Sequence, residues 1–280
     1  MSDPRVGLAE LLAEQPFYEP VGDEIEVFDA AASQGLPVML KGPTGCGKTR
    51  LVEHMAYRLK VPLFTVSCHE DMTASDLLGR YVLAGEETVW IDGPLTRAVK
   101  EGGICYLDEI VEARQDATVA IHSLADHRRE LNLERQGGRT LRAAPGFLLV
   151  VSYNPGYQSV LKDLKMSTRQ RMVAIQLDFP APDLQRRIIL AETAVDPAAA
   201  ADLVKLGEAI SRVRDAGLRE VASTRALVSA AALISGGLDF RKAAIAAIAG
   251  PLTDDAELRD GLITMIDSYA SSESGPAAGR

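Results

Sequence analysis

The sequence predicts an α/β fold with a parallel five-stranded sheet flanked by helices, followed by a smaller region made of helices alone. Five short apolar runs alternate with segments of helical spacing, and a glycine-rich loop separates the first run from the next helix. After Pro180-Ala181-Pro182 the pattern is helical to the end. Strands that alternate with helices are typical of a parallel sheet covered on both faces.

The five apolar runs are the predicted strands, and each is short and apolar, as buried parallel strands are. They are Val38–Leu40, Leu63–Ser67, Ile104–Leu107, Phe147–Ser152 and Val173–Leu177. A helix is predicted before the first strand, over Asp23–Ser33. Two β-hairpins are predicted as inserts, one over about residues 79–94 between two helical pieces and one over about 130–143.

The chain is expected to form two domains. Residues 1–181 are predicted to form the α/β core and residues 182–270 a small all-α lid, because alanine-rich stretches of helical pattern recur there. These stretches are Asp196–Ile210, Ser223–Ile234 and Phe240–Ala249. Residues 271–280 are Ser, Gly, Pro, Ala and charged residues, which predicts a disordered tail.

Composition narrows the class of protein. A chain of 280 residues with 47% hydrophobic and 25% charged residues can bury a full core without disulfide support. Its net charge of −9 argues against a general nucleic-acid coat. No apolar stretch is long enough to cross a bilayer, and the N-terminus has no signal pattern. Cys46, Cys68 and Cys105 lie in or beside predicted strands and the glycine loop, so we expect reduced thiols in a cytoplasmic protein.

The glycine-rich loop fits G-x-x-x-x-G-K-[ST], the P-loop that cradles phosphates. It follows a predicted strand and precedes a predicted helix, whose dipole favours an anion at its start. Lys48 is expected to reach the β- and γ-phosphates, and the Thr49 hydroxyl to ligate Mg²⁺. The sequence therefore predicts ATP and Mg²⁺ as cofactors. The predicted nucleotide-binding residues are Gly42, Pro43, Thr44, Gly45, Cys46, Gly47, Lys48, Thr49 and Arg50.

Two acidic residues, Asp108 and Glu109, end the third predicted strand. Carboxylates at a buried strand tip are costly unless a cation meets them. Asp108 is expected to hold Mg²⁺ through a coordinated water. Glu109 is expected to orient and deprotonate the attacking water as the general base.

Further candidates for ATP hydrolysis follow the next strands. Asn154 ends the fourth strand, where ligands of a parallel sheet bind, and is expected to reach the γ-phosphate or the water. A short helix is predicted over Lys162–Lys165. After it, shortly before the fifth strand, an arginine can point across a subunit boundary at the phosphate of a neighbour. Such an arginine finger stabilises charge in the transition state. Arg171 is the first choice and Arg169 the reserve.

The helical region offers Arg225, which begins a helix and is expected to reach the γ-phosphate from the lid. Ser223 or Thr224 is expected to cap that helix. The histidines point to no metal site: His122 and His127 are five residues apart and do not share a helix face as zinc ligands at i, i+4 would.

These motifs together resemble an AAA+ ATPase, and the two hairpins resemble the MoxR branch of that superfamily. Longer strings resemble the CbbQ/NirQ/NorQ family over roughly residues 17–235. They are Lys41–Arg50, Ser67–Asp71, Asp108–Asp116 and Val151–Ser159. The sequence departs from the family pattern at Met172. MoxR-type sequences commonly have an aromatic residue directly after the finger arginine, and methionine keeps the bulk and apolar character of that side chain.

The resemblance implies a ring hexamer that hydrolyses ATP at subunit interfaces and acts with a partner carrying a von Willebrand A domain. CbbQ works with CbbO to free inhibited rubisco of bound sugar phosphates, and NorQ works with NorD in maturing nitric oxide reductase. The local motifs do not separate these clients. On overall similarity we favour rubisco activation as the hypothesis, with nitric oxide reductase as the alternative.

More distant alternatives remain open at this point. A P-loop small-molecule kinase would need an acceptor site, and it would need neither Asn154 nor an interfacial arginine. A nucleic-acid motor would share the hairpins, but the chain is acidic. A scaffold without hydrolysis would not need Glu109. Tyr81, Val82 and Trp90 on the first hairpin could grip a partner or pack the base of the hairpin itself.

Overall fold

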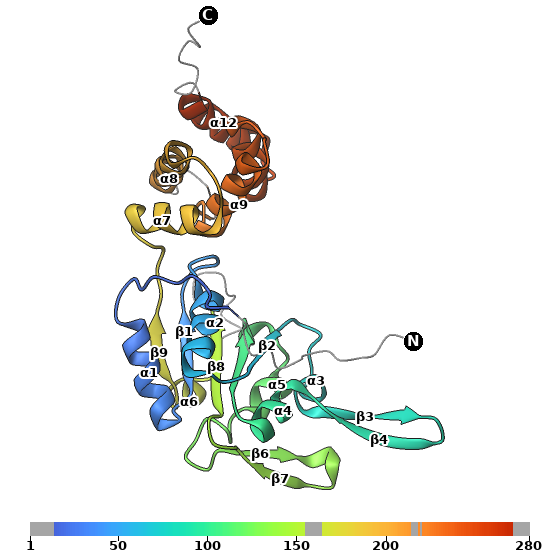
Figure 1. Cartoon of the computed structure of the whole chain (residues 1–280). Helices are drawn as coiled ribbons and strands as arrows, with labels where there is room; N and C mark the ends of the chain where they lie inside the picture. The colour runs from blue at the N-terminus through green and yellow to red at the C-terminus, as the bar shows by residue number, and fades with distance from the viewer. Residues whose placement is uncertain (1–13, 155–163, 214–217, 219, 271–280) are drawn as a thin grey trace, which may run out of the picture. The chain divides into compact units, whose positions relative to one another are not determined.

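A computed structural model describes residues 14–154, 164–213, 218 and 220–270. Within them the chain forms two compact units (Figure 1). The first unit runs to Pro43 and from Lys48 to Leu177, and the second comprises Thr44–Gly47 and the chain from Asp178. The predicted tail over residues 271–280 and part of the Val151–Ser159 string lie outside the described residues. Among the described residues, every helix is too short or too polar to cross a membrane.

The first unit is built on the predicted five-stranded sheet, in the order β2-β5-β8-β1-β9. All neighbouring strands pair in parallel. The strands are β1 (Val38–Lys41), β2 (Leu63–Ser67), β5 (Ile104–Asp108), β8 (Leu148–Tyr153) and β9 (Val173–Gln176). This order puts β5, β8 and β1 side by side, so their carboxyl ends meet at one edge of the sheet.

Helices pack on the sheet and leave its three central strands, β5, β8 and β1, largely buried. All six residues of β8 are buried, as expected for an apolar strand with neighbours on both sides. Helix α1 contacts β9 and α2, while α4 contacts β2 and β5. The helices of this unit are α1 (Glu24–Gln34), α2 (Lys48–Leu59), α3 (Ala74–Leu78), α4 (Pro94–Glu101), α5 (Gln115–Ala120) and α6 (Met166–Arg169).

The helix expected just before the fifth strand begins later than predicted. Leu164 and Lys165, the described part of the predicted 162–165 helix, are not helical, and α6 begins at Met166. The helix therefore contains Thr168 and Arg169 instead of preceding them. Arg171 follows it within two residues.

Both predicted hairpins are present. The first, β3 (Gly79–Ala84) with β4 (Glu87–Asp92), lies between α3 and α4 and extends away from them (Figure 1). The second pairs β6 (Glu130–Leu133) with β7 (Arg139–Arg142). Gly79 is required where the first hairpin begins, because its φ is +124° and a Cβ there would lie 2.4 Å from the Ile91 carbonyl oxygen.

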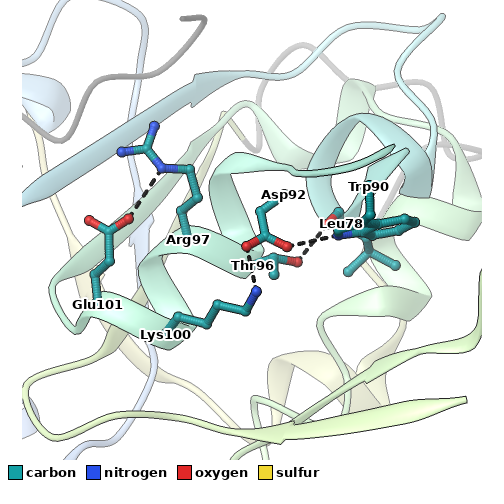
Figure 2. Close-up of polar contacts among 7 residues, drawn as sticks. All are labelled: Leu78, Trp90, Asp92, Thr96, Arg97, Lys100 and Glu101. Carbon is teal, nitrogen blue, oxygen red and sulfur yellow. Dashed lines mark hydrogen bonds and ion pairs between the residues drawn. The ribbon is translucent and has the colours of Figure 1, made fainter. Parts of the chain in front are cut away.

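The base of the β3–β4 hairpin is fastened to α4 (Figure 2). The Trp90 indole N–H donates to Asp92 over 2.8 Å, and the Lys100 ammonium pairs with the same carboxylate. Helix α4 also contacts the residue just before β3, where the Thr96 hydroxyl donates to the Leu78 carbonyl over 2.6 Å. Trp90 therefore packs the base of the hairpin, which is one of the two roles that the sequence left open for it.

The outer part of the hairpin presents apolar side chains to solvent. Tyr81 contacts the Trp90 ring edge-on at 5.1 Å between centroids, yet it remains 50% exposed. Leu83, nearer the turn, is 77% exposed. Val89 and Ile91 on the opposite strand are exposed as well.

The second unit is helical, and its alanines pack a core of their own. Its helices are α7 (Pro182–Glu192), α8 (Pro197–Arg212), α9 (Thr224–Ser235), α10 (Phe240–Ala244), α11 (Gly250–Leu252) and α12 (Ala256–Ala270), with a π-helical turn at Ile245–Ala249. Ser223 caps α9, as predicted, by accepting from the Ala226 amide. A Cβ at Gly207 would lie only 3.3 Å from the Leu227 methyl groups, so the glycine permits close packing of α8 on α9.

Candidate active site

The glycine-rich loop connects β1 to α2 and holds the lysine side chain in place. Gly45 and Gly47 have φ of +79° and +102°, which glycine adopts without strain. Lys48 begins α2 and is 8% exposed. Its ammonium donates to the Gly42 carbonyl over 2.8 Å and to the Pro43 carbonyl over 2.9 Å. A buried ammonium requires such acceptors, so the charge stays inside the loop.

Two buried hydroxyl groups hold the carboxylate at the end of β5. The Tyr106 hydroxyl donates to Asp108 Oδ1 over 2.7 Å, and the Ser152 hydroxyl donates to the same oxygen over 2.5 Å. Tyr106 and Ser152 are both 0% exposed. Hydrogen bonds to a charged group are stronger than neutral ones. One oxygen of Asp108 is thus fixed by the protein.

The phenol of Tyr106 also connects two of the predicted magnesium ligands. Burial is the largest cause that raises its pKa, followed by the charge of Asp108. The hydroxyl therefore stays protonated and can donate. It forms a further hydrogen bond with Thr49, so Thr49 and Asp108 are joined through one phenol.

The residue after Asp108 has an unusual backbone conformation. Glu109 has φ 55° and ψ 45°, the left-handed region that non-glycine residues seldom adopt. Its amide donates to the Ser152 hydroxyl over 3.0 Å, so the hydroxyl that holds Asp108 also holds this backbone. Backbone strain of this kind is concentrated at functional sites.

Strand β8 brings Asn154 to the same edge of the sheet. Asn154 follows β8 directly and is 8% exposed. The Gly42 amide donates to the Tyr153 carbonyl over 3.4 Å, which ties the start of the glycine loop to the end of β8. The strand order therefore brings together the segments that carry Lys48, Asp108, Glu109 and Asn154.

The arginine candidates differ in their surroundings. The Arg169 guanidinium lies over the Tyr153 ring, 5.9 Å from its centroid, and is half-buried. Arg171 is exposed. Arg50 pairs with Glu53 over 3.3 Å in the first turns of α2. Arg225 is exposed at the start of α9, in the second unit.

Tyr106 and Ser152 are site residues that the sequence alone did not predict. A weak signal existed for each. Tyr106 precedes Asp108 by two residues and so shares its face of the strand. Ser152 is the polar residue in an otherwise apolar run, and a buried hydroxyl needs a partner.

The residues at this edge fit a magnesium-bound triphosphate. Lys48 provides a fixed ammonium where α2 begins. The hydroxyl of Thr49 and the carboxylates of Asp108 and Glu109 are oxygen ligands of the kind that Mg²⁺ prefers. Cys68 adds no charge, because burial, Asp108 and Glu109 raise the pKa of its thiol to about 12.

Comparison with known proteins decides the family. The family described as AAA domain (dynein-related subfamily) matches residues 37–172, and the one described as CbbQ/NirQ/NorQ C-terminal matches residues 185–269. The denitrification regulatory protein NirQ of Pseudomonas aeruginosa is 57% identical over 91% of this chain and 98% of that protein. The chain belongs to the CbbQ/NirQ/NorQ family.

Relatives of this family carry three names. Protein NorQ of Paracoccus denitrificans is 57% identical over 88% of this chain and 91% of its own length. Protein CbbQ of Hydrogenophilus thermoluteolus is 53% identical over 89% of this chain and 93% of its own length. Among solved structures, a mutant RuvB of Thermotoga maritima superposes with a TM-score of 0.52 and 16% identity, covering 89% of this chain and 72% of that one, which shows a shared fold.

Membership in this family makes the chain an AAA+ ATPase, an ATP hydrolase. A small-molecule kinase and a scaffold without hydrolysis are thereby set aside.

Proposed function

We propose that this chain forms a ring, most simply a hexamer, that couples hydrolysis of ATP to remodelling of a client protein. The observation that carries the proposal is the convergence of Lys48, Asp108, Glu109 and Asn154 at the carboxyl ends of three adjacent strands. Ligands of open parallel sheets bind at that edge. The ring itself follows from the resemblance to AAA+ ATPases.

Each residue at this edge has a proposed task. Lys48 binds the β- and γ-phosphates, while Thr49 and Asp108 hold Mg²⁺, which neutralises charge on the phosphates. Glu109 accepts a proton from the attacking water. Asn154 orients that water or the γ-phosphate. The hydrogen bonds from Tyr106 and Ser152 keep Asp108 in one orientation, so little reorganisation is needed on binding.

Two arginines are proposed to complete the site. Arg171 extends to the ATP of the neighbouring subunit as the arginine finger. Its exposure supports this choice over Arg169, which covers Tyr153. Met166, 64% exposed on the preceding helix, gives the same surface an apolar side chain that a neighbouring subunit can cover. Arg225 is proposed to sense the γ-phosphate from the helical unit.

The proposed output is movement of the two hairpins. Because ATP and ADP make different contacts with the site, they favour different arrangements of the lid and the core. The β3–β4 hairpin is the proposed contact for a partner with a von Willebrand A domain of the CbbO or NorD type. Its exposed apolar residues Tyr81 and Leu83 support this role.

The first candidate client is an enzyme of denitrification, in particular nitric oxide reductase. The NirQ and NorQ relatives are each 57% identical to this chain, and NirQ is named a denitrification regulatory protein. Rubisco, the first hypothesis from the sequence, becomes the second candidate, which the 53% identical CbbQ relative supports.

The variant Glu109→Gln tests the proposal. It keeps the shape of the side chain but cannot accept a proton, so ATP should still bind while turnover falls by roughly two to four orders of magnitude. Held in its ATP state, a tagged ring of this variant should co-purify with the von Willebrand A partner and the client. Glu26→Gln, exposed on α1 and away from both the site and the hairpin, is the matched control. Undiminished turnover in Glu109→Gln would remove Glu109 from its role as base.

A further inference from the structure

The short helix α6 buries a single side chain. It spans Met166–Arg169, all of which the structure describes, and a helix of this length is not stable by itself. Thr168 is its one buried residue, at 1% exposure. Together with the Arg169 guanidinium over the Tyr153 ring, what Thr168 contacts therefore helps to fix where the helix lies.

Thr168 is bonded to a histidine that is distant in the sequence. Its hydroxyl oxygen lies 2.7 Å from His122 Nε2, which is a hydrogen bond between residues 46 positions apart. A buried hydroxyl is costly without a partner, so this bond matters more than an exposed one. His122 lies in the turn after α5, where its amide donates to the Val119 carbonyl over 3.1 Å.

The candidate finger, Arg171, is close enough to His122 to lower its pKa. Burial is the largest cause that lowers the pKa of His122, and Arg171 and then Lys165 lower it further. The ring is thus neutral at neutral pH, and Arg171 is close enough to act on it electrostatically. A neutral ring can bond the Thr168 hydroxyl without repelling the arginine.

Apolar contacts secure the two ends of the same segment. Leu164, before α6, is 5% exposed, and Met172, directly after Arg171, packs against the core of the first unit. Between these contacts the Thr168–His122 bond is the central attachment. Exposed Arg171 extends from a segment that is fixed on both sides of it.

We infer that His122 is a positioning residue for the arginine finger: through Thr168 it fixes α6 and so sets where Arg171 meets the ATP of the neighbouring subunit. This inference rests on the proposed function. His122 ends the stretch that starts at Glu109 and continues through the turn Ile110–Glu112 and α5. One subunit thus connects its own proposed base to the arginine it offers its neighbour.

Thr168→Val tests the bond with little change of shape, because it replaces only the hydroxyl. Turnover of ATP should fall on the order of tenfold to a hundredfold, because small misplacements of reacting groups lower rates by factors of this size. The KM for ATP should stay unchanged, because nucleotide binding is left intact. Thr168→Ser retains a hydroxyl and should retain activity, and His122→Ala should match Thr168→Val. His127→Ala is the control histidine, and thermal unfolding confirms that each variant is folded.

A mixed ring separates positioning of the finger from damage to the subunit's own site. The inference predicts that Thr168→Val subunits recover turnover when mixed with Lys48→Ala subunits, which bind no ATP productively but offer a correctly held Arg171. If the variant is as inactive in the mixture as alone, or if Thr168→Ser is as inactive as Thr168→Val, the inference is overturned.

The same mixture made with Arg171→Ala is run in parallel. Recovery with Arg171→Ala but not with Thr168→Val overturns the role of His122 and leaves the shared site standing. Recovery with neither removes the shared site, and the role of His122 with it. Recovery with both supports the inference.

Discussion

Single side chains around Asp108 show how the site is prepared before any nucleotide binds. Tyr106 and Ser152 donate to the same carboxylate oxygen over 2.7 and 2.5 Å, and Ser152 also accepts from the Glu109 amide. A carboxylate fixed in this way loses little entropy when it binds a cation. The two hydroxyl groups are therefore part of the proposed magnesium site through their hydrogen bonds to Asp108.

Ser152→Ala should weaken the magnesium site. The change removes a hydrogen bond to a charged group, about 1.5–3 kcal/mol, so roughly tenfold to a hundredfold more Mg²⁺ should be needed. The measurement is a magnesium titration of both ATPase rate and binding of a fluorescent ATP analogue. Ser235→Ala, which removes a hydroxyl bonded to the Ala231 carbonyl on α9, is the matched control. An unchanged magnesium requirement would show that Asp108 is oriented by other contacts.

Glu24 shows a buried carboxylate that stabilises the fold. It is 3% exposed and accepts from the Tyr18 hydroxyl and from the amides of Val21 and Gly22, over 2.6–2.7 Å. Burial, the largest single cause, would raise its pKa, but these hydrogen bonds together leave it below the ordinary value of 4.5. The segment before α1, residues 18–22, thus folds around one charge.

Glu24→Gln should lower the free energy of unfolding in a pH-dependent way. A carboxyl whose pKa is lower in the folded state stabilises the fold above its unfolded pKa, and this stabilisation is lost as the pH falls through the folded value. The variant should therefore be less stable than the parent at pH 7, and the gap should close below about pH 4.5. Denaturant unfolding across pH measures it, with exposed Glu26→Gln as control. A gap that is the same at every pH would contradict the role of the charge.

At the scale of elements, the sequence predicted all five strands of the sheet to within two residues at either end. Their apolar runs are local and short, and a parallel strand buried on both faces leaves just that pattern. Both hairpins were also predicted, because turn residues interrupt apolar alternation. Three sets of hydrogen bonds were not predicted. They join Glu24 to the segment before α1, Ser152 to Asp108, and Thr168 to His122. Each depends on tertiary geometry that no local sequence pattern records.

The edge of the sheet shows which features the sequence could predict and which came only from the structure. Lys48, Asp108, Glu109 and Asn154 each follow a predicted strand, so their types and places could be read from the sequence. The strand order that makes them neighbours comes from the structure. The predicted start of α6 was wrong because four residues carry too weak a periodicity to fix an end.

The hairpin base offers a direct reporter of this element. Trp90 is the single tryptophan of the chain, so intrinsic fluorescence reports on the hairpin base alone. Asp92→Ala removes the acceptor of the indole N–H, at a cost of roughly 1 kcal/mol. Trp90 emission should shift to the red and become easier to quench, while ATP binding persists.

The control lies on the same helix. Glu101→Ala on α4 breaks a neighbouring ion pair with Arg97 but leaves Trp90 and Asp92 untouched. Its fluorescence should equal that of the parent (Figure 2). Equal spectra for Asp92→Ala and the parent would mean that the Asp92 contacts do not fix the hairpin base.

At the scale of the whole molecule, the account requires more than one copy of the chain. The first unit supplies Lys48, two acids and an asparagine at one edge of its sheet, and an exposed arginine beyond α6. A finger that completes a neighbour's site makes hydrolysis depend on assembly. It also lets partner and client affect turnover by changing how subunits meet.

Mixing two inactive variants tests this claim most directly. Lys48→Ala cannot hold the phosphates, and Arg171→Ala cannot complete its neighbour's site, so each should be inactive alone. In randomly mixed rings about a quarter of the sites combine an intact Lys48 with an intact Arg171 from the next subunit, and turnover should return to about that fraction. A mixture as inactive as its two components would contradict a site shared between subunits.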